Sequence, residues 1–450
     1  MNRSDVVSLI ADQLAPQAQR ERARLDEIDK WLSTENPVEE IRRAHTDPNS
    51  ERIALAQLSH TPILRLVVEE CAQQMVLDGV ASGQRDTTSL WTPWERNGMP
   101  SRQGALWGAA LGYGLAYTIT MPGVVPGVIG RAAAIRPTSP RDLYVVYADP
   151  AEDEWPMYGL RTIRQAGGSV HYRLIDEGSE HFVSFEDGVL KYIEERVHGV
   201  GVPPIVRYAN GLDLEGRSPG EVDKHKVVAR RGNKTTHDRL LIQHYNSWRV
   251  RTATGLEEPG SLDESERQKA ILRNEDILTG GEGVTFGSLP ETTLDGVLKA
   301  AEADRDTLAA LSQTPVWALN GGQLVNLSAD ALAEARSMSR LKVQDKQRGL
   351  GRPLAQNLRL AAMIEGRDED AADFNLKMKW ADVESRSMSQ AADALGKIAS
   401  QLEVPVEMLW DLIPGVSKTT ADEWRAWRAQ HPSETQALAD AIGRQGSIEA

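Results

Sequence analysis

The chain contains 450 residues, a length that predicts about three domains. Of these residues 40% are hydrophobic and 26% charged, a composition typical of a water-soluble protein. Its formal net charge of −14 argues against non-specific affinity of the whole chain for free nucleic acid, because phosphate binding requires clustered cations. The single cysteine, Cys71, excludes an intrachain disulfide.

The first 215 residues predict helices followed by an antiparallel sheet. Apolar side chains recur at helical spacing in residues 1–35, as two helices, and again in 61–79. No charged residue occurs from Gly104 to Gly130, but the glycines and prolines there favour a buried helix followed by a buried strand over a membrane span. Between Leu143 and Val197 the apolar residues alternate and short turn sequences intervene, which predicts an antiparallel meander.

Residues 216–255 predict a long helix. Ser218 fits the N-cap, Pro219 the first helical position and Glu221 the capping box, while Gly255 fits the C-cap. Gly232 is expected to bend or divide this helix. Its packed face is predicted by residues at helical spacing, namely Leu241, Tyr245 and Trp248.

Downstream of this helix the polarity of the chain changes several times. A polar, acidic stretch reaches Pro290, and a second amphipathic helix is expected from Leu294 to Leu311. The segment 313–327 contains no charge, which is compatible with a buried connection or with an exposed loop tip around Asn320. A helix follows from Ser328 to about Gly366, with a kink expected near Pro353. Short helices complete the chain from residue 381.

Three segments carry a family resemblance. The run NKTTHDRLLIQHYNSWRVRTATG resembles the stem helix of portal proteins from tailed bacteriophages of the long-tailed siphophage type. The run TLAALSQTPVWALNGGQLVNLSADALAEARSMSRLKVQDKQRGLG is similar to the stem, tunnel-loop and long-helix sequence of these proteins. The run WERNGMPSRQGALWGAALGYGLAYTIT resembles the wing segment that precedes their sheet.

The resemblance implies an α+β, portal-type fold in seven parts. These are a helical and antiparallel-sheet wing (1–215), a first stem helix region (216–255), a small clip (256–292), a second stem helix (293–312), a tunnel loop (313–327), a long kinked helix that returns to the wing (328–380) and a helical crown (381–450).

The resemblance also implies roles for particular residues. The tunnel loop that contacts DNA would contain Val316, Trp317, Ala318, Leu319, Asn320, Gly321, Gly322 and Gln323. Stem and subunit packing would use Leu241, Tyr245 and Trp248. The part of the clip that faces the motor and connector would contain Glu257, Glu258, Asp263, Glu264 and Glu266.

The implied function is a ring, twelve-fold in this family, at one vertex of the capsid. Double-stranded DNA would pass through it without sequence specificity during packaging and ejection, and neutral loop residues would touch the duplex without gripping it. The implied partners are the terminase motor, a head-tail adaptor, and the major capsid and scaffolding proteins, with no membrane. The protein would be assembled in the bacterial host cytoplasm and located in the virion.

The sequence shows no convincing catalytic motif, so we expect neither enzymatic activity nor a cofactor. The stretch PGVSKTTADEW has a lysine at Lys418 but no glycine before it, and we interpret it as a turn into a helix capped by Thr419 or Thr420. An intracellular mixed-fold enzyme or nucleotide-dependent DNA translocase remains the alternative, and measurable ATPase activity would favour it.

Histidines and cations of this chain have ordinary structural interpretations. We expect His171 and His181 on the surface of the sheet, and His225, His237 and His244 on helix surfaces, none of them binding a metal. The basic cluster of Arg230, Arg231, Lys234 and Arg239 is expected to pair with acids of a neighbouring helix, in preference to DNA.

Overall fold

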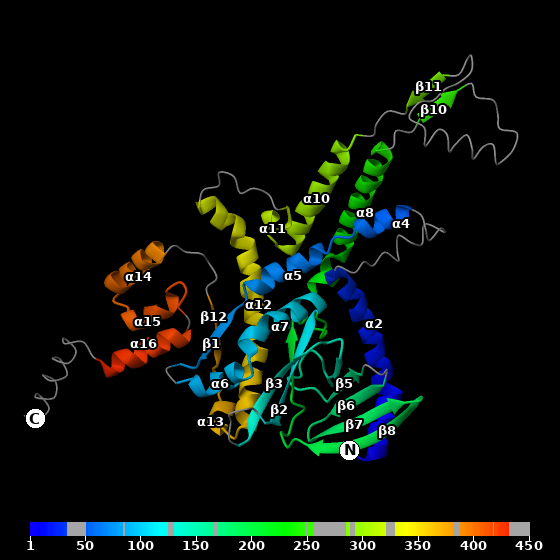
Figure 1. Ribbon diagram of the computed structural model, residues 1–450. Coiled ribbons are helices and arrows are strands. Elements are labelled where there is room, and N and C mark those ends of the chain that lie inside the picture. Colours follow the sequence, from blue (N-terminus) through cyan, green and yellow to red (C-terminus); the bar gives the residue numbers. More distant parts are fainter. Residues whose placement is uncertain are drawn as a thin grey trace, which may run out of the picture. The chain divides into compact units, whose positions relative to one another are not determined.

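The computed structural model describes eleven stretches of the chain, and every structural statement below concerns these residues (Figure 1). They are residues 1–33, 51–83, 86–124, 130–165, 169–247, 251–254, 285–288, 293–320, 329–381, 388–416 and 418–431.

The chain divides into two compact units. The first contains Met1–Asp26, Val68–Gly220 and Arg340–Ala450, and the second contains Glu27–Val67 and Glu221–Ser339. Because each unit is assembled from segments far apart in the sequence, neither could be delimited by a simple cut in the chain.

Helices occur in both units. They are α1 (Arg3–Leu9), the π-helical η1 (Ile10–Leu14), α2 (Ala15–Leu32), α4 (Glu51–Leu58), α5 (Ile63–Gln73), α6 (Thr88–Arg96), α7 (Met99–Tyr113), α8 (Glu221–Ser247), α10 (Asp295–Ser312), α11 (Val316–Asn320), α12 (Ala329–Ile364), α13 (Asp368–Ala371), α14 (Met388–Leu402), α15 (Val406–Leu409), the 3₁₀ turn η2 (Trp410–Leu412) and α16 (Lys418–Gln430).

The strands form four sheets in which every described pairing is antiparallel. One sheet pairs β1 (Leu77–Ala81) with β12 (Lys377–Trp380), and another pairs β10 (Arg251–Thr254) with β11 (Thr285–Ser288). The third has the order β3-β2-β9, from β2 (Leu115–Gly123), β3 (Ala132–Thr138) and β9 (Ile205–Ala209). The fourth follows chain order through β4 (Leu143–Val146), β5 (Tyr158–Arg164), β6 (Val170–Ile175), β7 (Ser179–Glu186) and β8 (Val189–Val197). The predicted α+β class and the predicted meander are therefore confirmed.

The N-terminal helical run covers one face of the five-stranded sheet. Val6, Ile10 and Leu14 recur every four residues, so they share a face, and all three are at most 3% exposed. They pack against buried leucine and valine side chains of the three central strands, Leu160, Leu174 and Val183. Burial of each such side chain stabilises the fold by about 1.5–3 kcal/mol. The two helices expected in residues 1–35 are α1 and α2, which the π-helical η1 joins without a gap.

The uncharged segment after Gly104 folds inside the first unit. It contains most of α7 and then β2, with Trp107, Leu111 and Ile119 buried, which confirms the predicted helix and strand. Within the described residues, no helix combines the length and the apolar content that a membrane crossing requires.

A buried polar contact joins α12 to the three-stranded sheet. The Thr120 hydroxyl donates to Asn357 Oδ1 at 2.7 Å, and Asn357 Nδ2 donates to the Tyr208 hydroxyl at 3.0 Å. All three side chains are fully buried. Because buried polar groups must be paired to avoid a desolvation cost, this contact specifies how α12 meets the sheet.

Helix α8 differs at both ends from the long helix predicted for residues 216–255. It begins at Glu221, since the Ser218 hydroxyl donates to the Gly114 carbonyl at 2.6 Å instead of capping a helix. It ends at Ser247, and residues 251–254 belong to β10, so Gly255 does not terminate it. The helix also continues through Gly232, which therefore does not divide it.

The residues just before α8 pack closely, backbone against backbone, on the end of α7. Gly114 has a left-handed φ of 93°, and a Cβ atom there would lie 2.0 Å from the Ser218 carbonyl oxygen. A Cβ atom on Gly220 would lie 2.2 Å from the Gly112 carbonyl oxygen. Only glycine fits at both positions, and this contact displaced the predicted capping box.

Candidate functional site

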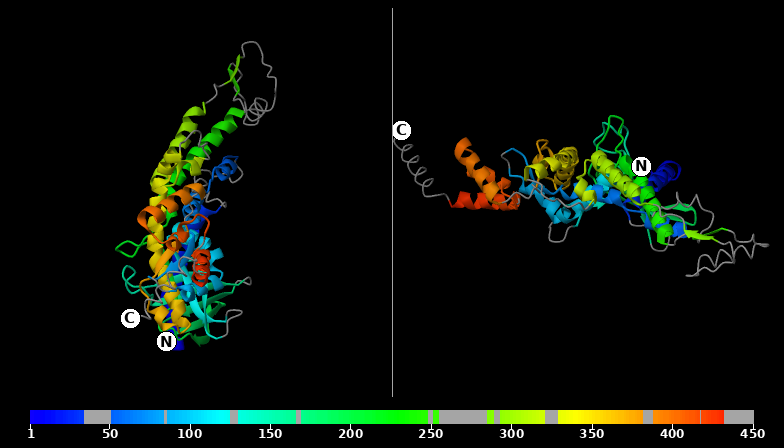
Figure 2. Two further views of the ribbon diagram at one scale, coloured as in Figure 1. Left: turned by 90° about the vertical axis from the view of Figure 1, so that its left-hand side faces the viewer. Right: turned by 90° about the horizontal axis from the view of Figure 1, so that it is seen from above.

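In the second unit, α8 and α10 lie side by side and run in opposite directions, which Figures 1 and 2 show from three sides. Asp304 of α10 links them: its two carboxylate oxygens accept from Arg231 Nε at 2.5 Å and from the Thr235 hydroxyl at 2.8 Å. The Asp304 side chain is 13% exposed, so this ion pair is screened less than a surface pair.

The basic cluster on α8 is thus in part engaged within the chain. Besides the Arg231 contact, Lys234 pairs with Asp238 one turn along the same helix at 2.5 Å. The expected pairing with an acid of a neighbouring helix is confirmed for Arg231. These contacts use cations that DNA would otherwise contact.

A cavity of about 80 Å³ lies between the two helices and α5. Gly232 is among its lining residues, and no atom lies within 4 Å of the position of a Cβ atom there. The glycine therefore leaves free volume in the helix pair within this unit.

The three predicted packing residues fall at the end of α8. Leu241 is half-buried, and Tyr245 belongs to the helix. The side chain of Tyr245 and the whole of Trp248 lie outside the described residues. The role of this face in subunit contact stays a prediction.

The predicted tunnel loop begins as folded structure. After α10, Gln313 adopts a left-handed φ of 53°, and the Thr314 amide donates to the Ala309 carbonyl at 3.0 Å. Val316, Trp317, Ala318, Leu319 and Asn320 then form the short helix α11. Leu319 is buried and Asn320 is exposed, so the described half of this segment is a short helix that is partly buried.

The polar end of α11 is fixed to α10. Asn320 Nδ2 donates to Asp306 Oδ1 at 3.5 Å, and the guanidinium of Arg336 lies 5.9 Å from the centre of the Trp317 ring. The remaining predicted loop residues Gly321, Gly322 and Gln323 lie outside the described residues. Their contact with DNA remains a proposal.

The predicted clip is described only at its base. Strand β10 pairs with β11, with Arg251 opposite Ser288 and Thr254 opposite Thr285. The acidic residues predicted for this part, Glu257, Glu258, Asp263, Glu264 and Glu266, all lie outside the described residues.

Three histidines are more buried than the sequence suggested. His181 is completely buried, with Nε2 at 3.2 Å from Asp176 Oδ2 and Nδ1 at 3.1 Å from the Tyr192 hydroxyl. His225 and His237 are 7% and 8% exposed, so the prediction of surface histidines was wrong for all three. The described part of the chain contains no cluster of three or more His, Cys, Asp or Glu residues arranged to hold a metal ion.

Lys418 is engaged in structural contacts. It begins α16, its amide donates to Asp78 Oδ2 at 2.6 Å, and its ammonium pairs with Asp422 at 2.6 Å. The predicted turn into a helix is confirmed, but Thr419 and Thr420 lie inside the helix and do not cap it. A lysine already paired with a carboxylate is poorly suited to bind a phosphate.

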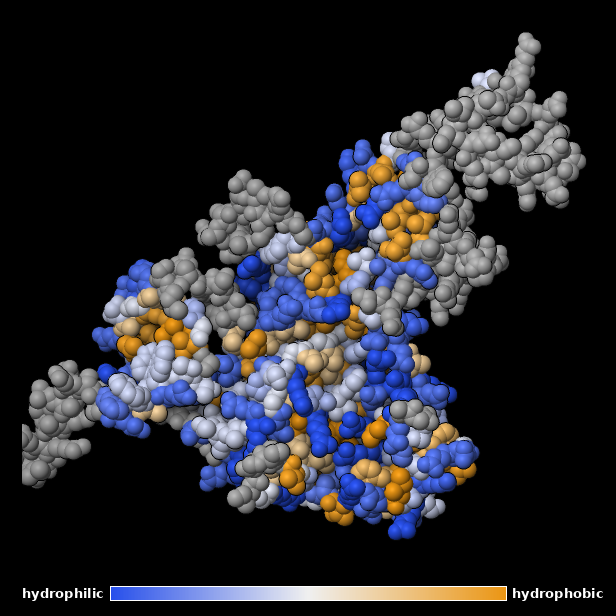
Figure 3. All heavy atoms as spheres, viewed as in Figure 1, coloured by the Kyte–Doolittle hydropathy of each residue, from blue (hydrophilic) through white to orange (hydrophobic). Residues whose placement is uncertain are grey.

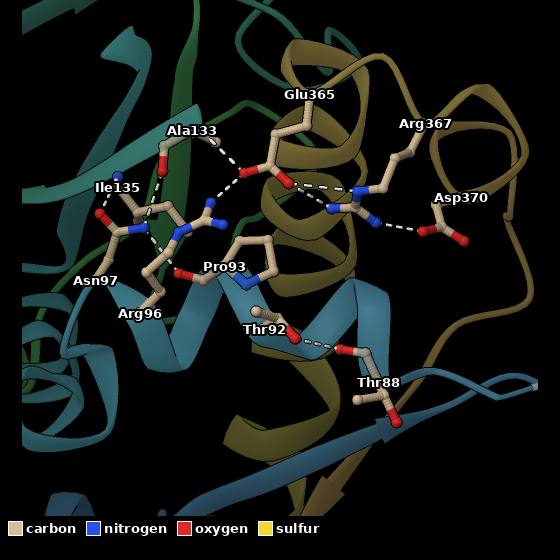
Figure 4. Close-up of polar contacts among 10 residues, drawn as sticks. All are labelled: Thr88, Thr92, Pro93, Arg96, Asn97, Ala133, Ile135, Glu365, Arg367 and Asp370. Carbon is tan, nitrogen blue, oxygen red and sulfur yellow. Dashed lines mark hydrogen bonds and ion pairs between the residues drawn. The ribbon is translucent and has the colours of Figure 1, made fainter. Parts of the chain in front are cut away.

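The first unit contains an ionic network that sequence reasoning missed (Figure 4). Glu365, at the end of α12, accepts from the Ala133 amide at 3.0 Å and pairs with Arg96 of α6 and with Arg367. Arg367 in turn pairs with Asp370. Burial alone would raise the pKa of Glu365, but the amide and the two guanidinium groups outweigh it and hold that pKa below its ordinary value.

The C-terminal helices expose apolar side chains. Figure 3 shows hydrophobic residues gathered over α14 and α15. Exposed by more than half are Leu402, Val406, Met408 and Leu412. Contiguous exposed apolar surface of this kind is typical of a surface that contacts another protein.

The solved structures to which this chain is similar include chains of gene transfer agent (GTA) particles. A chain from the neck of the native particle, computed with C12 symmetry, has a TM-score of 0.46 at 12% identity, covering 80% of this chain and 89% of that chain. A chain from the neck of the empty particle, computed with C6 symmetry, has a TM-score of 0.45 at 14% identity, covering 80% and 95%. A chain from the native virion has a TM-score of 0.43 at 13% identity, covering 81% and 94%.

The family comparison is decisive. A search of curated proteins returns no match for this chain. The family model described as "Phage portal protein, SPP1 Gp6-like" matches residues 11–436, which is nearly the whole chain. The chain therefore belongs to the SPP1 Gp6-like family of phage portal proteins.

Proposed function

We propose that this portal protein forms a closed ring of twelve subunits at one capsid vertex, and that double-stranded DNA passes through the ring during packaging and ejection. The observation that carries the proposal is the α8–α10 pair. Two long antiparallel helices, joined at their far end through β10 and β11, form a stiff element suited to line a channel. A ring also requires heterologous contacts between unlike faces of adjacent copies.

The seven parts named from the sequence take their places in this proposal. The pair α8–α10 is the stem, the connection based on β10 and β11 is the clip, and the segment that starts with α11 is the tunnel loop. Helix α12 returns the chain to the wing, and α14–α16 form the crown. Leu241, Tyr245 and Trp248 would pack between neighbouring subunits.

The proposed partners follow from the same arrangement. The acidic clip residues would face the terminase motor and then the head-tail adaptor, and the wing would meet the major capsid and scaffolding proteins. ATP hydrolysis belongs to the separate motor, and this chain serves as conduit and docking platform. It would be assembled in the bacterial host cytoplasm and remain in the virion.

Electron microscopy of the purified chain tests the ring. We expect rings with an axial channel in negative-stain class averages, and a native mass of twelve subunits. Particles without a channel, or a protein that stays monomeric at micromolar concentration, would contradict the proposal. A different closed symmetry would correct the subunit number and retain the conduit.

A further inference from the structure

The first unit carries an open groove of about 870 Å³ that no predicted role uses. One wall is a face of α12 from Gln344 to Arg359, and the other is the segment from Phe374 to Trp380, which includes β12. Glu154 also lines it. The lining residues of α12 recur at three- and four-residue spacing, so they project from one side of the helix.

The groove is positively charged. Arg348, Arg352 and Lys377 are exposed, and none of them has a hydrogen bond or ion pair to any residue that the structure describes. Only Arg359 is neutralised, by Glu154 at 2.7 Å. The groove thus holds three uncompensated cations in a chain whose net charge is −14.

The geometry of the cations suits a phosphate backbone. Arg348 and Arg352 are one helical turn apart, about 6 Å along the axis, and each guanidinium can donate two parallel hydrogen bonds to a phosphate. Phe374 is 76% exposed, with the guanidinium of Arg359 4.1 Å from its ring centre, and offers an aromatic surface beside the charges.

We propose that this groove binds the backbone of double-stranded DNA without sequence specificity. The proposal rests on the proposed function, because the ring brings a duplex to the protein, but it concerns a contact outside the tunnel loop. An acidic protein segment is the less favoured occupant, since protein–DNA interfaces are much more positively charged than protein–protein interfaces.

Salt dependence of DNA binding measures this contact. Each neutralised phosphate contributes about 0.9 to the slope of log affinity against log salt. Removing Arg348 and Arg352 should therefore reduce the magnitude of this negative slope by about 1.8. Between 50 and 200 mM NaCl, the salt-induced loss of affinity should then be about 12-fold smaller than in the wild type.

The experiment uses the full-length protein and a fluorescent duplex of about 30 base pairs with random sequence, followed by anisotropy. The test variant is Arg348→Gln/Arg352→Gln. Its matched control is Lys191→Gln/Arg196→Gln, which removes two exposed cations of β8 that are paired with Glu186 and Glu194. We expect the slope to fall in the test variant and to match the wild type in the control.

An unchanged slope in the test variant would overturn the inference. Loss of rings in that variant alone would also overturn it, by assigning the groove to a neighbouring copy. Tighter binding of poly-L-glutamate than of the duplex to the wild type would assign it to an acidic protein segment instead. Electron microscopy of the wild type decides the ring separately, so failure of the proposed function is distinguishable from failure of the groove.

Discussion

At the scale of single residues, glycines decide how the chain approaches α8. Gly114 and Gly220 allow two backbone segments to pass within contact distance, with Asn210 Nδ2 donating to the Pro219 carbonyl beside them at 2.9 Å. A side chain at either position would meet backbone atoms, which cannot rotate away. The packing of this crossing is therefore specified by the absence of a methyl group.

Gly220→Ala should destabilise the protein by about 3 kcal/mol, because the new methyl group overlaps the Gly112 carbonyl and forces the backbone apart. Chemical denaturation of the purified variant measures the loss. The control is Gly104→Ala, where no atom lies within 4 Å of the new Cβ atom. Equal stability of the two variants would show that the crossing relaxes without cost.

Glu365→Gln should cost about 3 kcal/mol at pH 7, because it leaves Arg96 and Arg367 facing a neutral group. The lowered pKa of Glu365 means that its stabilising effect is present above the ordinary value of 4.5 and is lost as the pH falls through the folded-state pKa. The difference between wild type and variant should shrink in acid. Denaturation at pH 7 and pH 4 checks this, with the exposed Glu152→Gln as the control. A difference that is independent of pH would contradict the assignment.

At the scale of elements, the sequence predicted kinds of structure better than their limits. The alternation of apolar and polar residues predicted the meander of β4–β8, and apolar residues at helical spacing predicted α7, α8 and α10. Both predictions succeed because the local period of apolar residues reflects burial of one side of an element. The start of α8 was wrong because the Ser218 hydroxyl bonds to Gly114, 104 positions away. Arg348, Arg352 and Lys377 form one groove only after α12 meets β12, so no linear motif could reveal them. His181 was misplaced because burial of a polar residue depends on distant partners such as Asp176.

Within α8, Gly232→Ala should raise the free energy of unfolding by about 0.5–1 kcal/mol. Alanine restricts the unfolded chain and favours the helix, and the position has open space within its unit. Thermal unfolding of the purified protein measures the gain. A lower midpoint, or loss of rings at unchanged monomer stability, would show that another copy packs closely against this position.

In the predicted tunnel loop, Gly322→Lys should leave ring assembly unchanged and slow DNA translocation, more at low salt than at high salt. A lysine would hold the passing phosphates, and this attraction is screened by salt. Single-particle packaging rates provide the measurement. Gly104→Lys on α7 adds the same charge outside the loop and serves as the control. A rate equal to wild type at low salt would place Gly322 away from the DNA path.

At the scale of the whole molecule, the described residues of this chain that resemble a nucleotide site have a structural role. Lys418, the lysine of the PGVSKT stretch, pairs with Asp422 and packs over Gly79. Its contacts belong to the docking of α16 on β1.

Purified rings should therefore show no ATP hydrolysis above background, and Lys418→Ala rings should package DNA when the terminase motor is added. A coupled phosphate-release assay and a nuclease-protection packaging assay make the two measurements. Asp422→Ala, which removes the partner of the same ion pair, is the matched control for structural effects. If Lys418→Ala rings assemble but fail to package while Asp422→Ala rings succeed, that result would favour the alternative that this chain is a nucleotide-dependent translocase.

The buried contact of Asn357 with Thr120 and Tyr208 has a mechanical consequence. A slip of α12 by one residue would carry Asn357 about 1.5 Å along the axis and about 100° around it. The Thr120 hydroxyl and the Asn357 amide would then lose this pairing in a dry environment, at about 1–3 kcal/mol each, and the Tyr208 hydroxyl would keep only one of its two described partners, Thr118. The contact therefore sets the register of α12 on the three-stranded sheet and opposes sliding of the helix along it.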